Sequence, residues 1–173
     1  NCNFKVLENG KIKFGEYAEI FLERAGSTGT GGIMYLYPNS RIEHENMAEI
    51  QIKDYAILND CGPIITGSGV FCILKHPNGT WNIGTQYCNP SLVRTFTNGE
   101  FAVIAGGPGA VNVASGCKIV FDGPGSFLKC EPGSIINFGQ NAFLEFRNGA
   151  YIEANGCTFT NLNTGEGWNG IVL

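Results

Sequence analysis

The sequence predicts an all-β chain that forms a right-handed parallel β-helix (β-solenoid), with about 24 residues per coil and an irregular insertion. Three observations support this fold: an eight-residue repeat, turn residues between the repeat units, and 25 glycines among 173 residues. Charged residues make up 15% of the chain, against roughly 25% in an average soluble domain. Short strands separated by tight corners around one shared core explain all of these features.

The most regular repeat lies between residues 117 and 160. One apolar residue recurs there every eight positions, and a small residue often stands two positions before it. Because residues two apart in a strand share a face, we expect this column to point inward. Three units of strand and corner then complete one coil. The expected core column is Val120, Leu128, Ile136, Leu144 and Ile152.

Changes of phase divide the chain into three parts. Residues 1–60 are predicted to form N-terminal coils, 61–116 an irregular insertion or decorated coils, and 117–173 regular coils. The last part stops within an expected strand, so truncation at the C-terminus is expected. A helical alternative stays open near residues 14–22, where apolar residues also fit a spacing of three and four.

Several segments resemble a known family of repeats. They are Pro132-Gly-Ser-Ile-Ile, Asn148-Gly-Ala-Tyr-Ile, Cys157-Thr-Phe-Thr-Asn and Trp168-Asn-Gly-Ile. They are similar to the right-handed parallel β-helix repeats of large secreted, Bacteroidota-type bacterial surface proteins. The resemblance covers 117–173 well and 10–60 loosely. It implies the fold and an extracellular setting, and it carries over no catalytic residue.

Composition excludes some classes of function. With 11 Lys and Arg against 15 Asp and Glu, no surplus of positive charge is available for nucleic acid. No apolar run reaches the roughly 20 residues of a transmembrane segment. Seven cysteines cannot all pair within one chain, but a single disulfide among Cys61, Cys72 and Cys88 would fit an exported protein.

The sequence contains little that predicts catalysis. Glycoside hydrolysis needs paired carboxylates, whereas Asp54, Asp60 and Asp122 are scattered. The run Glu43-His44-Glu45 has two interpretations: a carboxylate pair for a cation or sugar, or a solvated strand face above a core histidine. A non-enzymatic chain is therefore favoured, with no catalytic residue, cofactor or metal ligand assigned.

Aromatic residues supply the candidate binding positions. One residue before each core position stands an apolar column, expected to face outward, in which Phe127 would lie under Tyr151, Ile119 under Phe143, and Ile135 under Phe159. A partner, a second copy, segment 61–116 or a glycan would cover this column. If the two faces are reversed, the column is core. Trp81 and Tyr87 are further candidates, either projecting from the irregular segment or packing within it. The candidate binding set is Phe127, Phe143, Tyr151, Trp81 and Tyr87.

These features together predict a segment of a secreted or cell-surface protein that acts as an adhesin, stalk or assembly scaffold. Its expected partner is a protein or a glycan at the cell surface. Two alternatives stay open. One is a β-helix that binds or cleaves polysaccharides, and the other is a fibre subunit that stacks through the ends of the solenoid.

Overall fold

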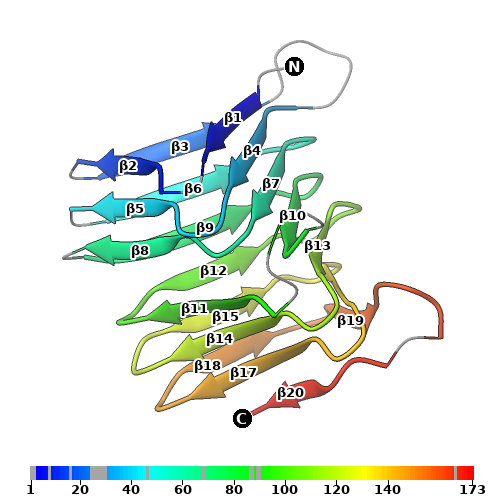
Figure 1. Ribbon diagram of the computed structural model, residues 1–173. Helices are drawn as coiled ribbons and strands as arrows, with labels where there is room; N and C mark the ends of the chain where they lie inside the picture. Colours follow the sequence, from blue (N-terminus) through cyan, green and yellow to red (C-terminus); the bar gives the residue numbers. More distant parts are fainter. Residues whose placement is uncertain are drawn as a thin grey trace.

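The computed structural model describes residues 3–7, 9–15, 17–23, 31–45, 47–67, 69–85, 88, 91–165 and 167–173. The chain winds as a parallel β-solenoid, and its strands follow one another in groups of three around the coil (Figure 1). Paired strands of successive coils lie in register and parallel, so each residue stacks on its counterpart in the next coil. The predicted solenoid is confirmed, and no helix occurs among the described residues.

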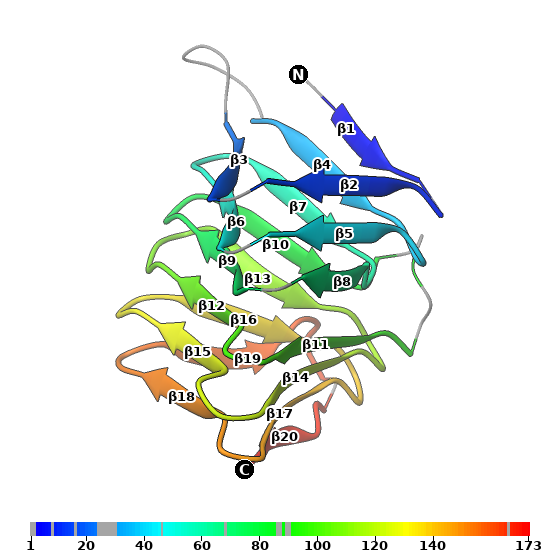
Figure 2. The ribbon, with the colours of Figure 1, turned by 90° about the vertical axis from the view of Figure 1, so that its left-hand side faces the viewer.

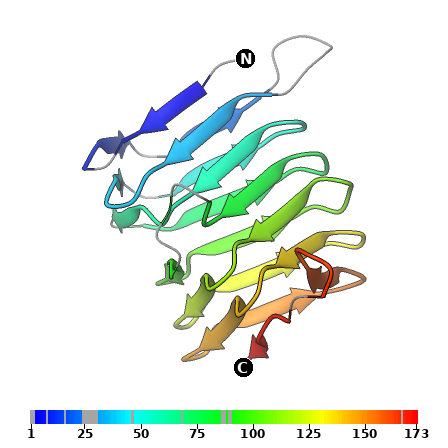
Figure 3. The ribbon, with the colours of Figure 1, turned by 45° about the vertical axis from the view of Figure 1, so that its right-hand side comes forward.

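Face 1 is a continuous seven-stranded sheet (Figure 3). Its strands are β1 (Asn3–Val6), β4 (Ile33–Leu36), β7 (Ile57–Asp60), β10 (Thr80–Ile83), β13 (Ala110–Val113), β16 (Ile135–Phe138) and β19 (Thr158–Asn161). Face 3 has six strands: β3 (Ala18–Leu22), β6 (Ala48–Ile52), β9 (Phe71–Lys75), β12 (Phe101–Ile104), β15 (Phe127–Cys130) and β18 (Tyr151–Ala154).

Face 2 is divided into two sheets (Figure 2). The first contains β2 (Lys11–Phe14), β5 (Arg41–His44) and β8 (Ile64–Gly67), and the second β11 (Val93–Thr97), β14 (Lys118–Asp122), β17 (Phe143–Arg147) and β20 (Gly170–Val172). β8 and β11 are consecutive on this face, yet they are not hydrogen-bonded as strand neighbours. We call this interruption the sheet break. The helical alternative near residues 14–22 is wrong, because β2 and β3 occupy that region.

The described part of 61–116 consists of coils, so decorated coils is the better of the two sequence interpretations. Strands β8 to β13 follow the same three-face order as the rest of the chain. Irregularity is concentrated in the connection 84–92, which joins β10 to β11. A disulfide between Cys61 and Cys88 ties this connection to the corner after β7, with Cα atoms 5.0 Å apart. The predicted disulfide in this segment is confirmed.

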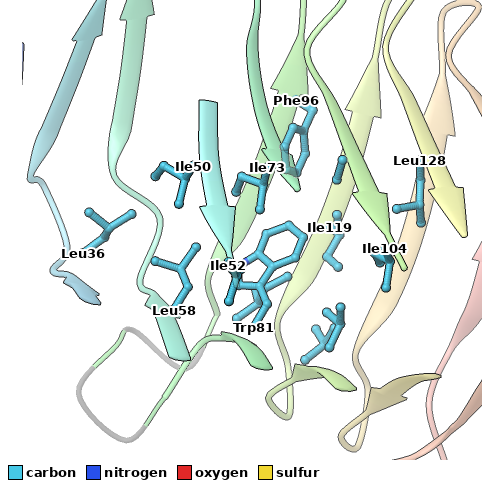
Figure 4. Packing of buried hydrophobic residues seen from close by; sticks show 14 of the residues in the cluster. Leu36, Ile50, Ile52, Leu58, Ile73, Trp81, Phe96, Ile104, Ile119 and Leu128 are labelled. Atoms are coloured by element: carbon cyan, nitrogen blue, oxygen red, sulfur yellow. The ribbon is translucent and has the colours of Figure 1, made fainter. Parts of the chain in front are cut away.

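The core is one apolar column per inward position, continuous along the solenoid (Figure 4). Of the predicted core column, Leu128, Ile136 and Leu144 are fully buried and Ile152 packs against them. Val120 is the exception. It is buried, but it occupies an outward position, because Ile119 and Phe121 on either side fill the core.

Coil length explains where the predicted stacking fails. Phe127 does pair with Tyr151, 24 residues on. On face 2 the coil is 25 residues long, so Phe143 lies over Lys118 and Ile119 turns inward over Leu144. On face 1 it is 23, which places Phe159 inward over Ile136. The predicted pairs Ile119–Phe143 and Ile135–Phe159 are therefore wrong.

An asparagine ladder on the outer side of face 1 follows from the same register. The side-chain amide of Asn137 donates to Asn112 (2.8 Å), Asn112 to Asn82 (2.9 Å) and Asn82 to Asn59 (3.0 Å). Each amide thus has both a donor and an acceptor partner along the solenoid axis, a repeated arrangement that stabilises flat stacked strands.

We expect Asn112→Ala to lower the free energy of unfolding by about 1–3 kcal/mol, because it removes two hydrogen bonds worth about 1 kcal/mol each. Chemical denaturation measures this change. Thr80→Ala, on the same face at an outward position outside the ladder, is the control, with an expected change within about 0.5 kcal/mol. Equal effects of both substitutions would show that the ladder contributes nothing.

Candidate functional site

An aromatic ladder on the outside of face 3 contains two of the predicted binding residues. Phe127 stacks on Tyr151 with ring centroids 5.3 Å apart, and on Phe101 of the preceding coil at 4.7 Å. The rings are nearly parallel, at 15° and 5°. The sequence prediction missed Phe101, because the eight-residue repeat was not followed through 61–116. The recurrence of an aromatic before an apolar core residue was the available signal.

The orientation of these rings limits what they can bind. Phe127 is sandwiched, so neighbouring rings occupy both of its faces. Sugars bind aromatic side chains by stacking on a ring face, and Phe127 cannot offer one. The ladder instead contributes ring edges to a flat apolar surface. This geometry suits a protein surface better than a stacked glycan.

Aliphatic side chains widen the ladder into an apolar strip. Leu74 and Val103 occupy the next outward position on face 3 and pair with each other across β9 and β12. Lys129 and Glu153 continue that column on β15 and β18 and border the strip with charge. We define the apolar strip as Leu74, Phe101, Val103, Phe127 and Tyr151.

The other predicted binding residues lie elsewhere. Phe143 is on the outside of face 2, where the ammonium of Lys118 lies 4.1 Å from its ring centroid. Trp81 is 1% exposed and points into the core, against the edge of Phe96. The interpretation of Trp81 as a projecting residue is therefore wrong, since position 81 belongs to the regular strand β10. Tyr87 lies outside the described residues.

The sheet break opens into a cleft of about 320 Å³. One wall belongs to the corner before β8 and to β8 itself, and the other to β11 and the turn after it. The lining is apolar at Pro63, Ile64 and Val93 and polar at Thr95, Thr97, Arg94 and Glu100. No residue of this cleft was predicted as a site, because segment 61–116 had been assigned no register.

An ion pair replaces two aliphatic core residues beside this cleft. Arg94 stands in the inward column that has Ile119 and Leu144 in the next two coils. Asp60 occupies a position filled by Leu36 and Ile83 in the adjacent coils. Arg94 Nε lies 3.1 Å from Asp60 Oδ2, and both side chains are almost completely buried. The geometry leaves these two atoms without a hydrogen bond.

Neighbouring groups hold the ion pair in place. The backbone N–H of Gly62 donates to Asp60 Oδ1 at 2.8 Å. The guanidinium carbon of Arg94 lies 4.6 Å from the ring centroid of Phe96, within the range of a cation–π interaction. A charge buried in this way is retained only with such partners, because desolvation costs several kcal/mol per ion.

Glu100 adds a second buried carboxyl group. Its Oε2 accepts a hydrogen bond from the backbone N–H of Thr97 at 2.7 Å. Burial raises the pKa of Glu100, while the Thr97 hydrogen bond and the nearby Arg94 and His44 oppose that shift. The cleft therefore contains a carboxyl group that takes up a proton more readily than an exposed glutamate.

The predicted Glu43-His44-Glu45 cluster is split between the two sides of the sheet. His44 is buried in the core at 4% exposure, next to Phe71. Outside, Glu43 pairs with Lys11 at 2.7 Å and Glu45 with Lys13 at 3.1 Å, and the pKa of Glu43 is lowered chiefly by its hydrogen bond to Lys11. This arrangement matches the solvated strand face over a core histidine. Among the described residues, no group of three His, Cys, Asp or Glu is placed to hold a metal ion.

The fold and these surfaces define the class of protein as a parallel β-solenoid with an outer apolar strip and a polar cleft. Comparison with family models, with curated proteins and with solved structures found no match. Over the described residues, no helix is long and apolar enough to cross a membrane.

We expect Asp60→Leu alone to destabilise the chain by about 3–5 kcal/mol, because it leaves the Arg94 charge buried and unpaired. The double variant Asp60→Leu/Arg94→Leu restores the aliphatic columns and should regain most of this loss. A double-mutant cycle measured by denaturation tests the coupling. Additive losses would contradict an energetically significant ion pair.

The raised pKa of Glu100 predicts a pH dependence. A folded-state pKa above the unfolded value gives stability that is present at low pH and is lost as the pH rises through the folded-state pKa. Glu100→Gln removes this loss, so the variant should gain stability relative to the parent between about pH 4 and pH 7. Denaturation at several pH values measures the difference. A constant difference would contradict the assignment to Glu100.

Proposed function

We propose that this chain is a non-enzymatic solenoid segment of a secreted or cell-surface protein, which acts as an adhesin, stalk or assembly scaffold. The apolar strip on face 3 is the surface that contacts a protein partner. The single observation that carries this proposal is the alignment of Phe101, Phe127 and Tyr151 over three successive coils. Aromatic residues fixed on a rigid sheet lose little conformational entropy on binding.

The position of the ionisable groups supports binding rather than catalysis. Asp60 and Arg94 neutralise each other inside the core, and neither side chain is more than 3% exposed. Their geometry is suited to a structural role, since a catalytic pair must reach its substrate.

An extracellular location is part of the proposal. The Cys61–Cys88 disulfide supports it, because disulfides persist mainly in oxidising compartments. The resemblance of 117–173 to repeats of secreted bacterial surface proteins points the same way.

The second candidate is a polysaccharide-binding solenoid, and the polar cleft favours it. Arg94, Thr95 and Glu100 border an opening of about 320 Å³ with an apolar wall at Ile64. Such a mixture of polar groups and a hydrophobic wall is typical of small-ligand sites. The two candidates use different faces, so substitutions can separate them.

A surface array of extracellular-matrix proteins and glycans tests the proposal. We expect the chain to bind a protein on this array, and Tyr151→Ser to weaken that binding at least about tenfold, as truncation of an interface aromatic commonly does. Val93→Ser is the matched control, because Val93 is 51% exposed on face 2 whereas Tyr151 is 43% exposed on face 3. Folding of both variants is checked by thermal unfolding.

Binding confined to glycans, and reduced by Thr95→Val in the cleft, would replace the proposal by the second candidate. Light scattering during size-exclusion chromatography addresses the fibre alternative. Growth of the apparent mass with concentration would favour self-stacking over binding of a different protein.

A further inference from the structure

Two further cysteines meet at the corner between face 3 and face 1. Cys130 is the last residue of β15 and points inward, with 1% exposure. Cys157 stands directly before β19 in the following coil and is partly exposed. Their thiols are hydrogen-bonding neighbours, and both are free in the structure. The remaining free cysteines among the described residues, Cys72 and Cys117, are both buried.

Backbone pairing fixes these two positions relative to each other. Cys130 pairs with Ala154 across β15 and β18. The N–H of Thr158 donates to Ser134 O at 2.8 Å, and the N–H of Gly133 donates to Gly156 O at 2.8 Å. The corner that carries Cys157 is therefore hydrogen-bonded directly onto the corner that follows Cys130.

An equivalent pair of positions earlier in the solenoid measures how close such side chains come. Strand register places Ile52 in the column of Cys130, and Gly79 at the corner position of Cys157. A Cβ built on Gly79 would lie 3.0 Å from Cγ2 of Ile52. A disulfide needs its two Cβ atoms within roughly 3.5–4.5 Å and its sulfurs between them. This corner brings side chains of successive coils to that separation.

We propose that Cys130 and Cys157 form a second inter-coil disulfide when the chain meets a disulfide-containing oxidant. The separation of the two residues along the chain is 27, the same as that of the bonded pair Cys61 and Cys88. The two bridges would lie at different corners, the first between faces 1 and 2 and the second between faces 3 and 1.

Exposure sets the order of the chemistry. Burial, with the neighbouring Cys157 adding to it, raises the pKa of Cys130 to about 12, so this thiol stays protonated. Cys157, the more exposed thiol, loses its proton and attacks the oxidant's disulfide, which releases one thiolate. The Cys130 sulfur then attacks Cys157 Sγ and gives up its proton, and the second thiol of the oxidant leaves. Two protein thiols are oxidised and one external disulfide is reduced.

Oxidised glutathione serves as the probe. After incubation with it, alkylation and digestion without reduction should yield one peptide pair joined through Cys130 and Cys157, lighter by two hydrogens than the two free peptides. Cys157→Ser should abolish this pair, whereas Cys72→Ser should leave it intact. Recovery of Cys130 and Cys157 as alkylated free thiols would overturn the proposal.

Thermal unfolding gives a second readout. In the oxidised state, the parent should melt roughly 10 °C above Cys157→Ser, as expected for closing a loop of this length in a chain of this size. In excess reductant both chains lack disulfides, and the difference should nearly vanish. An equal difference in both conditions would mean that Cys157 contributes only packing. The test uses purified chain, so its outcome is independent of the proposed binding function.

Discussion

In-register parallel stacking is the constraint on which the rest of this structure depends. Each side chain lies directly over the equivalent side chain of the next coil, so like residues form columns along the solenoid. Inside, these columns are aliphatic or aromatic, as with Phe96, Phe121 and Phe146, whose rings stack at 4.6 and 5.2 Å. Outside, the same rule produces the asparagine ladder and the apolar strip. A substitution in one coil is consequently felt by two neighbours rather than one.

The sheet break shows what happens when a column is interrupted. The imidazole of His44 fills the space above β5, and its ring atoms would lie 2.5 Å from a Cβ built on Gly67 in the next coil. Gly67 therefore contributes no side chain to the core at this level. The long Arg94 side chain occupies the next coil, stacked on Phe96 and paired with Asp60. One ion pair thus fills volume that two shorter aliphatic residues would fill in an unbroken sheet, at a cost in desolvation.

The repeat period made the solenoid predictable, but the exact stacking was not. A spacing of eight correctly gave the inward positions Leu128, Ile136 and Leu144, because alternation along a strand fixes the face. It could not give the coil lengths of 23 and 25 residues, since one residue more or less at a corner leaves the strand pattern unchanged. That is why the pair Phe127–Tyr151 was predicted and Phe143 was assigned the wrong neighbour. Arg94 and Glu100 were missed because their meaning depends on register, which glycine-rich corners conceal.

Variation in coil length also determines where a binding surface can form. An outer column becomes a continuous surface only where successive strands of that face keep the same positions outward, as β12, β15 and β18 do. On face 2 the break between β8 and β11 divides the surface, and on face 1 polar asparagines occupy the outer column. Face 3 alone, among the described strands, aligns three aromatic residues in sequence. A partner that requires a long flat apolar contact therefore finds it on face 3, whatever the chemistry of the cleft on face 2.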